Sequence, residues 1–161
     1  MADDEKDLLL AWLGAKRRHV LSTLGGVADE DVRRGVLPSG WSAIGAVQHL
    51  TFDVERWWFR AVLAGERVDL IEDNQAWVVA EDVAVSDVVA LYRDECERAD
   101  AIIRATALAA APAWWPGGVE GCPYADLREI LLHVIVETAT HAGHLDAVRE
   151  LVDGHQHLVM G

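Results

Sequence analysis

The stretch LLHVIVETATHAGHLDAVREL, residues 131–151, decides the fold class and carries the first candidate site. Its apolar residues recur every three or four positions, which is typical of the buried face of an α-helix. His133, Glu137, His141 and His144 follow one another in it at spacings of four, four and three. Because each helical residue advances by about 100°, these four side chains share one stripe of the helix. Glu137 and His141 lie at the margin of the buried face, and the other two lie further round.

The same helical period covers most of the chain outside this stretch. We predict helices over about residues 4–24, 43–64, 87–108 and 123–152, with glycines after three of them at 25–26, 65 and 154. Ser42 and Ser86 are the expected N-caps of the second and third helices, and one short helix is expected around Trp77. Strict alternation is hard to find, the best patch being residues 78–85. Four helices predict an all-α four-helix bundle, a single domain over residues 1–161, with long loops over one end that roof a site.

Composition narrows the functional class. The chain has 27 acidic and 14 basic residues, a net charge of −13, which disfavours nucleic acid and anionic membranes as partners. A hydrophobic fraction of 52% excludes disorder, and no apolar run reaches the roughly 18 residues of a membrane span. The start, MADDEKD, is acidic where a signal peptide is basic. Cys96 and Cys122 cannot build a disulfide framework. We therefore expect a soluble, cytoplasmic protein, and the small-molecule substrate is expected from the candidate site described next.

Glu137 and His141 predict part of a metal site, because a carboxylate and an imidazole one turn apart can ligate one divalent ion. A third ligand is expected from a facing helix, and the helix over residues 43–64 offers His49. Between the apolar sides of that helix runs a polar stripe of His49, Asp53, Arg56 and Arg60. Such a stripe lines a cleft, or else it is a solvated seam with one incidental histidine. The cleft interpretation gives a triad of His49, Glu137 and His141.

The remaining histidines and the tryptophans have simpler interpretations. We interpret His19, His155 and His157 as structural or surface residues. Trp57, Trp58, Trp114 and Trp115 are interpreted as core or loop anchors, with substrate walls as the alternative. Trp57 is the candidate among them for contact with a cofactor. Cys122 lies just before a helix N-terminus, where a reactive thiolate is the alternative to an inert thiol.

Two segments carry a resemblance to a known family. WSAIGAVQHLTFDVERWW, residues 41–58, and the stretch at 131–151 resemble the DinB/YfiT-like superfamily of metal-binding four-helix bundles. They are similar in particular to its actinobacterial branch, which includes mycothiol-dependent enzymes. The resemblance implies a divalent metal, commonly zinc or nickel, held by His49, Glu137 and His141. Glu137 stands where many relatives have histidine.

The resemblance also implies an activity. Relatives use the metal to bind a low-molecular-weight thiol as thiolate and add it to an electrophile, or to isomerise a substrate through a thiol adduct. We therefore predict a metal-dependent transferase of a mycothiol-like thiol, with a metal-dependent hydrolase and a non-catalytic metal or small-ligand binding protein as alternatives. His144 and Arg56 are the candidate catalytic residues. Arg56, Arg60 and Trp57 are candidates for binding the thiol, although pairing of the arginines with Asp53 is equally compatible with the sequence.

Assembly is predicted from the apolar surface. The helix over residues 43–64 is apolar on two sides, which is more than a minimal bundle buries. Association covers a surplus apolar face, so we expect a homodimer.

Overall fold

The computed structural model describes residues 2–71, 73–117 and 121–157. Its helices are α1 (Ala2–Leu24), α2 (Asp29–Arg33), α3 (Ala43–His49), η1 (Leu50–Leu63), η2 (Asp73–Trp77), α4 (Val85–Ala105) and α5 (Leu127–Asp153). These residues contain no strand, so the predicted all-α class is confirmed and the alternating patch at 78–85 is irregular until α4 begins. Within the same residues, no helix is long and apolar enough to cross a membrane.

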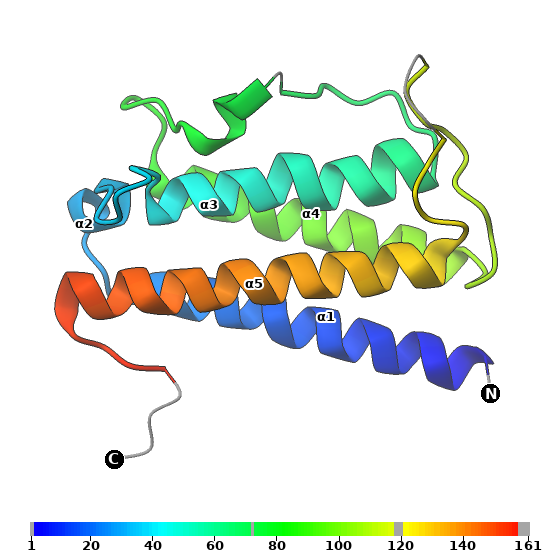
Figure 1. The fold of residues 1–161 in the computed structure, drawn as a ribbon, viewed down its shortest axis with the longest axis horizontal. Helices are drawn as coiled ribbons and strands as arrows, with labels where there is room; N and C mark the ends of the chain where they lie inside the picture. Colours follow the sequence, from blue (N-terminus) through cyan, green and yellow to red (C-terminus); the bar gives the residue numbers. More distant parts are fainter. Residues whose placement is uncertain (1, 72, 118–120, 158–161) are drawn as a thin grey trace.

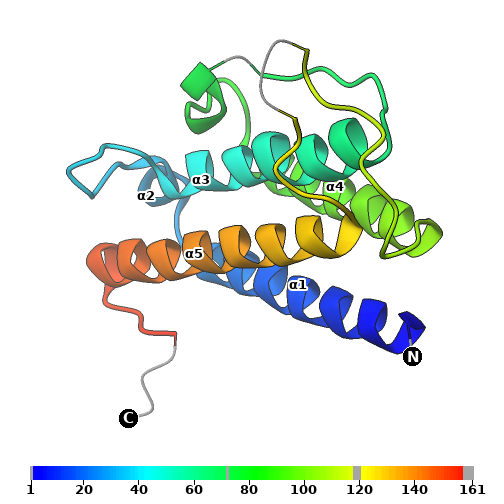
Figure 2. The same ribbon diagram turned by 45° about the vertical axis from the view of Figure 1, so that its right-hand side comes forward.

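Four long helices form the bundle: α1, the continuous helix made by α3 and η1, α4 and α5 (Figures 1 and 2). α1 and α5 run in the same direction, as the contacts of Arg128 with Glu5 and of Asp146 with His19 require. The α3–η1 helix and α4 both run in the opposite direction. Because these two are parallel, the connection over residues 64–84 has to return along the bundle, and Figure 1 shows it crossing above α3. The long loop expected over one end of the bundle is instead a crossover that lies over one face, because the two helices it joins are parallel.

Local signals explain most helix ends. The Ser42 side chain accepts a hydrogen bond from the Gly45 backbone N–H, which confirms the predicted N-cap, and Gly154 ends α5 with φ 76°. Two predicted starts are wrong. α4 begins at Val85 after Ala84, so Ser86 lies inside the first turn. α5 begins at Leu127 rather than near Pro123, since the Asp126 side chain caps the backbone N–H of Glu129. The short helix α2 was not predicted.

The largest departure from the expected helices is in η1. Its backbone bonds in the π pattern, in which each N–H donates to the carbonyl five residues earlier, as Ala64 N does to Phe59 O at 3.1 Å. A π-helix has more residues per turn than an α-helix, so a helical wheel with α spacing loses its register beyond His49. Trp58 consequently faces α5, where its ring lies 4.8 Å from that of His133. Arg56 and Arg60 turn instead toward Glu95 on α4.

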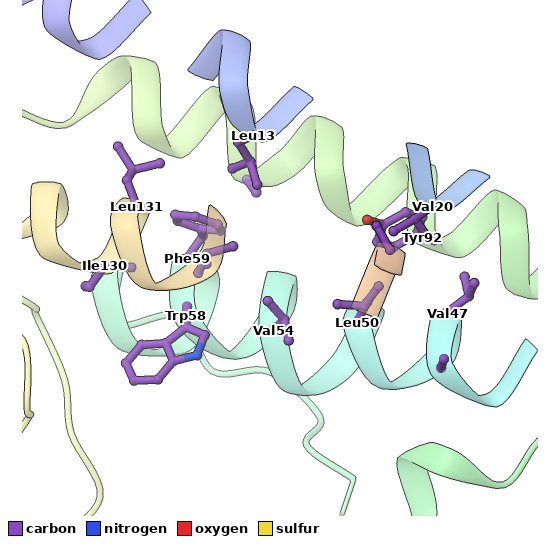
Figure 3. Close-up of a cluster of buried hydrophobic side chains, with 14 of the residues drawn as sticks. Leu13, Val20, Val47, Leu50, Val54, Trp58, Phe59, Tyr92, Ile130 and Leu131 are labelled. Carbon is purple, nitrogen blue, oxygen red and sulfur yellow. The ribbon is translucent and has the colours of Figure 1, made fainter. Parts of the chain in front are cut away.

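The core fills the space between the four long helices. Figure 3 shows side chains from each of them meeting there, among them Leu13 of α1, Phe59 of η1, Tyr92 of α4 and Leu131 of α5, all fully buried. Burying one such side chain contributes about 1.5–3 kcal/mol. The apolar residues of η1 on which the dimer prediction rested, including Phe59, Val62 and Leu63, are buried within the chain.

Candidate metal centre

The structure brings the three predicted ligands together between α3 and α5. Glu137 Oε1 lies 3.2 Å from Nε2 of His141 and 3.8 Å from Nε2 of His49. One ligand atom from each residue lies within 4.8 Å of the others. Ligands at about 2.0–2.1 Å from a tetrahedral metal stand about 3.3 Å apart. The spacing therefore fits one divalent ion after small side-chain adjustments.

A carboxylate on the same helix orients His49. Asp53 lies one turn further along, and its Oδ2 is 2.8 Å from Nδ1 of His49. We assign the ring proton to Nδ1, because the carboxylate can only accept. The lone pair of Nε2 is then aimed at Glu137, and this buried atom has no hydrogen-bond partner among the described residues. With His49 neutral, this nitrogen and the Glu137 carboxylate oxygen are two opposed acceptors that a bound cation would join, so the arrangement fits a metal ion.

A tryptophan from the crossover covers the two histidines. The Trp77 ring, at the end of η2, stacks on His49 with centroids 4.2 Å apart and lies 5.4 Å from the His141 ring. The short helix predicted around Trp77 is confirmed as η2, but no role was predicted for Trp77 itself. No local sequence pattern indicates that Trp77 contacts His49, because this contact depends on where the crossover lies in the folded chain.

Hydrogen bonds from Gln48, the residue before His49, hold the crossover against α3. The side-chain amide of Gln48 donates to the carbonyl oxygens of Ala76 and Val78, both at 3.0 Å. Gly45 lets the two segments approach, since a Cβ at this position would collide with the Trp77 carbonyl oxygen. Gly45 and Gln48 are thus positioning residues for the cover over the site.

Burial favours neutral imidazole at this site. It lowers the pKa of His141 below its ordinary value, and nearby His49 lowers it further, whereas Glu137 acts in the opposite direction. A neutral imidazole offers its lone pair, as metal ligation requires. The His141 Nδ1 atom is a second buried nitrogen for which the described residues supply no hydrogen-bond partner.

Two hollows lie between the α3–η1 helix and the crossover, next to residues that neighbour or contact His49. One has a volume of about 440 Å³ and is lined by Asp53, Trp57, Trp58, Leu70 and Ile71. The other, of about 590 Å³, is lined by Gln48, Leu70, Ile71, Gln75 and Val78. They share Leu70 and Ile71; one reaches Gln48, the residue before His49, and the other reaches Asp53, which contacts His49. Their volumes are in the range of small-molecule sites.

The arginines of the predicted stripe lie against protein carboxylates. Arg56 and Arg60 donate to Oε1 of Glu95 at 2.8 and 3.0 Å, and Nε of Arg60 also donates to Glu66. Asp53, the other expected partner, is bonded to His49 instead. The π turns of η1 explain this placement, because they rotate both arginines toward α4.

The two outer histidines of α5 differ in their surroundings. His144 is exposed, and its ring lies 5.6 Å from that of His141 and 6.2 Å from that of Trp41. His133 is packed between Trp58 and Tyr124, at ring distances of 4.8 and 4.9 Å, and burial lowers its pKa. His133 therefore belongs to an aromatic cluster, which the loop before α5 completes.

A family model described as mycothiol-S-transferase matches residues 8–154. The chain belongs to the mycothiol-S-transferase family. The matched region includes His49, Glu137 and His141, and the predicted resemblance to the DinB/YfiT-like superfamily is confirmed, because this family is part of it. Comparisons with curated proteins and with solved structures found no significant match. Family membership thus supports a mycothiol-related transferase.

Proposed function

We propose that the protein transfers mycothiol, or a similar small thiol, to a small electrophile at a divalent metal held by His49, Glu137 and His141. The proposal is carried by the buried Nε2 of His49, which faces Glu137 and has no hydrogen-bond partner within the described part of the chain, in a member of this family. Two imidazoles and one carboxylate suit zinc or nickel. Three protein ligands also leave a coordination position for a further group.

The residues around the proposed metal orient its ligands, balance its charge and cover it. When bound, the metal supplies a positive charge that keeps a thiol deprotonated near neutral pH. Asp53 holds the His49 tautomer, and Glu137 offsets part of the metal's charge. The Trp77 ring covers His49 and limits the access of water.

The hollow beside Asp53 is the proposed site for the organic part of thiol or electrophile. Its walls are Trp57, Trp58, Leu70 and Ile71, so an apolar or aromatic group fits it. The thiol-binding roles of Arg56 and Arg60 stay predictions, as does the catalytic role of Arg56. A substrate carboxylate would have to replace Glu95 on these guanidinium groups.

The test is metal content and thiol-transfer rate on the same preparations. His49→Ala is expected to lower metal at this centre to near background and the rate by more than about 100-fold, because it removes a ligand. His155→Ala is the matched control, an exposed histidine in the C-terminal segment. Full metal at this centre in His49→Ala would overturn the triad, and His133 and His144 would be tested next.

The same assays separate the alternative functions. Turnover of an ester or amide without thiol would identify a metal-dependent hydrolase. No turnover, together with a higher melting temperature on adding metal, would identify a binding protein. Consumption of thiol and electrophile only when metal is present supports the proposal.

His144 is the proposed substrate-contacting residue, since it lies next to His141 but is exposed. His144→Ala is expected to retain metal and lose activity. Full activity with full metal would make His144 an ordinary surface residue, and loss of metal would make it a ligand.

We also propose a homodimer, formed by the outer face of α1 and α5 rather than by η1. Four large apolar side chains are exposed there: Leu8 (58%), Trp12 (55%), Leu132 (49%) and Val136 (64%). The parallel register of α1 and α5 puts the first two beside the last two. A second copy presents the same face, so a two-fold pairing covers both. The cytoplasmic location expected from the sequence stays part of the proposal.

Trp12→Glu is expected to convert the dimer to a monomer in light scattering at about 50 μM, because it puts a charge into the apolar contact. Leu151→Glu, at an exposed position of 60% outside this face, is the control. A monomeric wild-type chain at that concentration would overturn the dimer.

A further inference from the structure

A second cluster of metal-ligating side chains lies on the far side of α5. Asp146 follows Glu137 by nine residues, or about two and a half turns, and therefore points away from the first centre. Nε2 of His19, on α1, lies 2.9 and 2.8 Å from the two carboxylate oxygens of Asp146. The His157 ring stacks on His19 with centroids 4.0 Å apart and an angle of 19° between the rings. One ligand atom from each of the three lies within 4.8 Å of the others.

A hydrogen-bonded turn after α5 sets the position of His157. Gly154, with φ 76°, reverses the chain after α5, and the backbone N–H of His155 donates to Asp153 at 3.0 Å. The side-chain amide of Gln156 donates to Glu150 at 2.8 Å. Figures 1 and 2 show the red segment after α5 leaving the helix and turning back beside the bundle. This turn carries His157 onto a side chain of α1.

A pair formed by His19 and Asp146 alone needs no explanation beyond joining α1 to α5. His157 indicates a metal site, because its imidazole completes a set of two nitrogen ligands and one carboxylate. Such a set suits Zn²⁺, Ni²⁺, Co²⁺ and Cu²⁺. Only 13% of the His19 side chain and 24% of the Asp146 side chain are exposed, so both are already ordered before a metal arrives. The net charge of −13 also favours cations near the chain.

We propose that His19, Asp146 and His157 form a second divalent metal site, which fastens the segment after α5 to α1. The stacked rings hold their lone pairs in nearly parallel planes, so ligation requires the exposed His157 ring to turn toward Asp146. An exposed side chain changes rotamer easily. This site does not depend on the proposed function, because its residues lie outside the first centre.

The test is a titration of the metal-free full chain with Zn²⁺, checked by elemental analysis and by the absorption of a Co²⁺-loaded sample. Wild type is expected to bind about two equivalents of Zn²⁺ per chain, and His157→Ala about one, with unchanged thiol transfer. His49→Ala is expected to keep the equivalent that His157→Ala loses, and the double variant to bind none. His155→Ala, the control, keeps both.

Full Zn²⁺ stoichiometry in His157→Ala would overturn the second site and leave His19 and Asp146 as a structural pair. Asp146→Asn is the second variant, and it is expected to lose the same equivalent as His157→Ala. Since His157 is exposed and lies beyond the last helix, its replacement tests the site without threatening the fold. Limited proteolysis adds a further readout, because Zn²⁺ is expected to protect the segment after α5 in wild type but not in His157→Ala.

Discussion

The α3–η1 helix packs against α4 on one side and α5 on the other. The charged side chains are paired at the first contact, whereas polar atoms at the second lack hydrogen bonds within the described residues. On the side of α4 and α1, each buried carboxylate has a cation. Arg17 donates to both oxygens of Glu55, at 2.7 and 2.6 Å, and Glu95 receives Arg56 and Arg60. Glu55 and Glu95 are only 1% and 2% exposed. Both carboxylates are paired with guanidinium groups, so they hold the helices together.

On the side of α5, the carboxylate and the imidazoles lack a full set of partners. The described residues give Glu137 only histidine partners, and His49 Nε2 and His141 Nδ1 are buried without hydrogen bonds there. An incomplete polar cluster costs stability, so a fold retains it where a ligand completes it. The difference teaches that one helix can join the bundle on one side and form a binding site on the other. Four predictions test this division.

The largest expected effect is on the paired side. Glu55→Ala leaves the Arg17 guanidinium buried, with Asp100 as its remaining carboxylate partner, so we expect the free energy of unfolding to fall by about 3–5 kcal/mol. Urea unfolding measures it. Glu66→Ala removes an exposed carboxylate from Arg60 and is expected to cost less than about 1 kcal/mol. A loss in Glu55→Ala no larger than in this control would contradict the assigned role of the pair.

On the α5 side, Glu137→Gln is expected to weaken metal binding by about 10–100-fold, because it removes the negative charge from the ligand set. The metal-free protein should unfold within about 0.5 kcal/mol of wild type, since none of the described lysines or arginines pairs with Glu137. Isothermal titration and urea unfolding of the same sample separate the two effects. Unchanged affinity would remove Glu137 from the ligand set.

Gly45→Ala tests the cover over the site. The new Cβ would meet the Trp77 carbonyl oxygen, so the crossover has to move, at a cost of about 1–3 kcal/mol. Metal affinity and the fluorescence of the tryptophans should change together. Gly143→Ala is the control, because a Cβ there meets no atom and alanine stabilises a helix by up to about 1 kcal/mol. Equal behaviour of the two variants would show that Gly45 is not needed for the cover.

The smallest expected effect is the pH dependence of the metal-free protein. Burial lowers the pKa of His133 and His141 in the folded chain, so the unfolded chain binds more protons below about pH 6.5. Stability is then complete above that pH and falls as the pH drops toward the lowered values. Urea midpoints between pH 7.5 and 5 measure the slope, and His133→Phe, which keeps an aromatic ring against Tyr124, should reduce it. An unchanged slope in that variant would assign the effect to other groups.

The sequence by itself determined the fold class, the four long helices and the residues of the candidate metal centre. The helices and the pairing of Glu137 with His141 depend on spacing within one helix or on a local cap, whereas His49 was predicted from the polar stripe of a second helix. Glu137 and His141 share a stripe because they are one turn apart, and Ser42 and Gly154 mark helix ends through bonds to their own neighbours. The superfamily resemblance rested on the same two helical segments.

Tertiary structure alone decided the partners of these residues. The π turns of η1 carried Arg56 and Arg60 to Glu95 and Trp58 to His133, against the register that an α-helical wheel assumes. The crossover brought Trp77 over His49, and the turn at Gly154 brought His157 to His19. The physical reason is that a helical period fixes the direction of a side chain only relative to its own helix. Which group it meets depends on how helices and connections distant in sequence pack against one another.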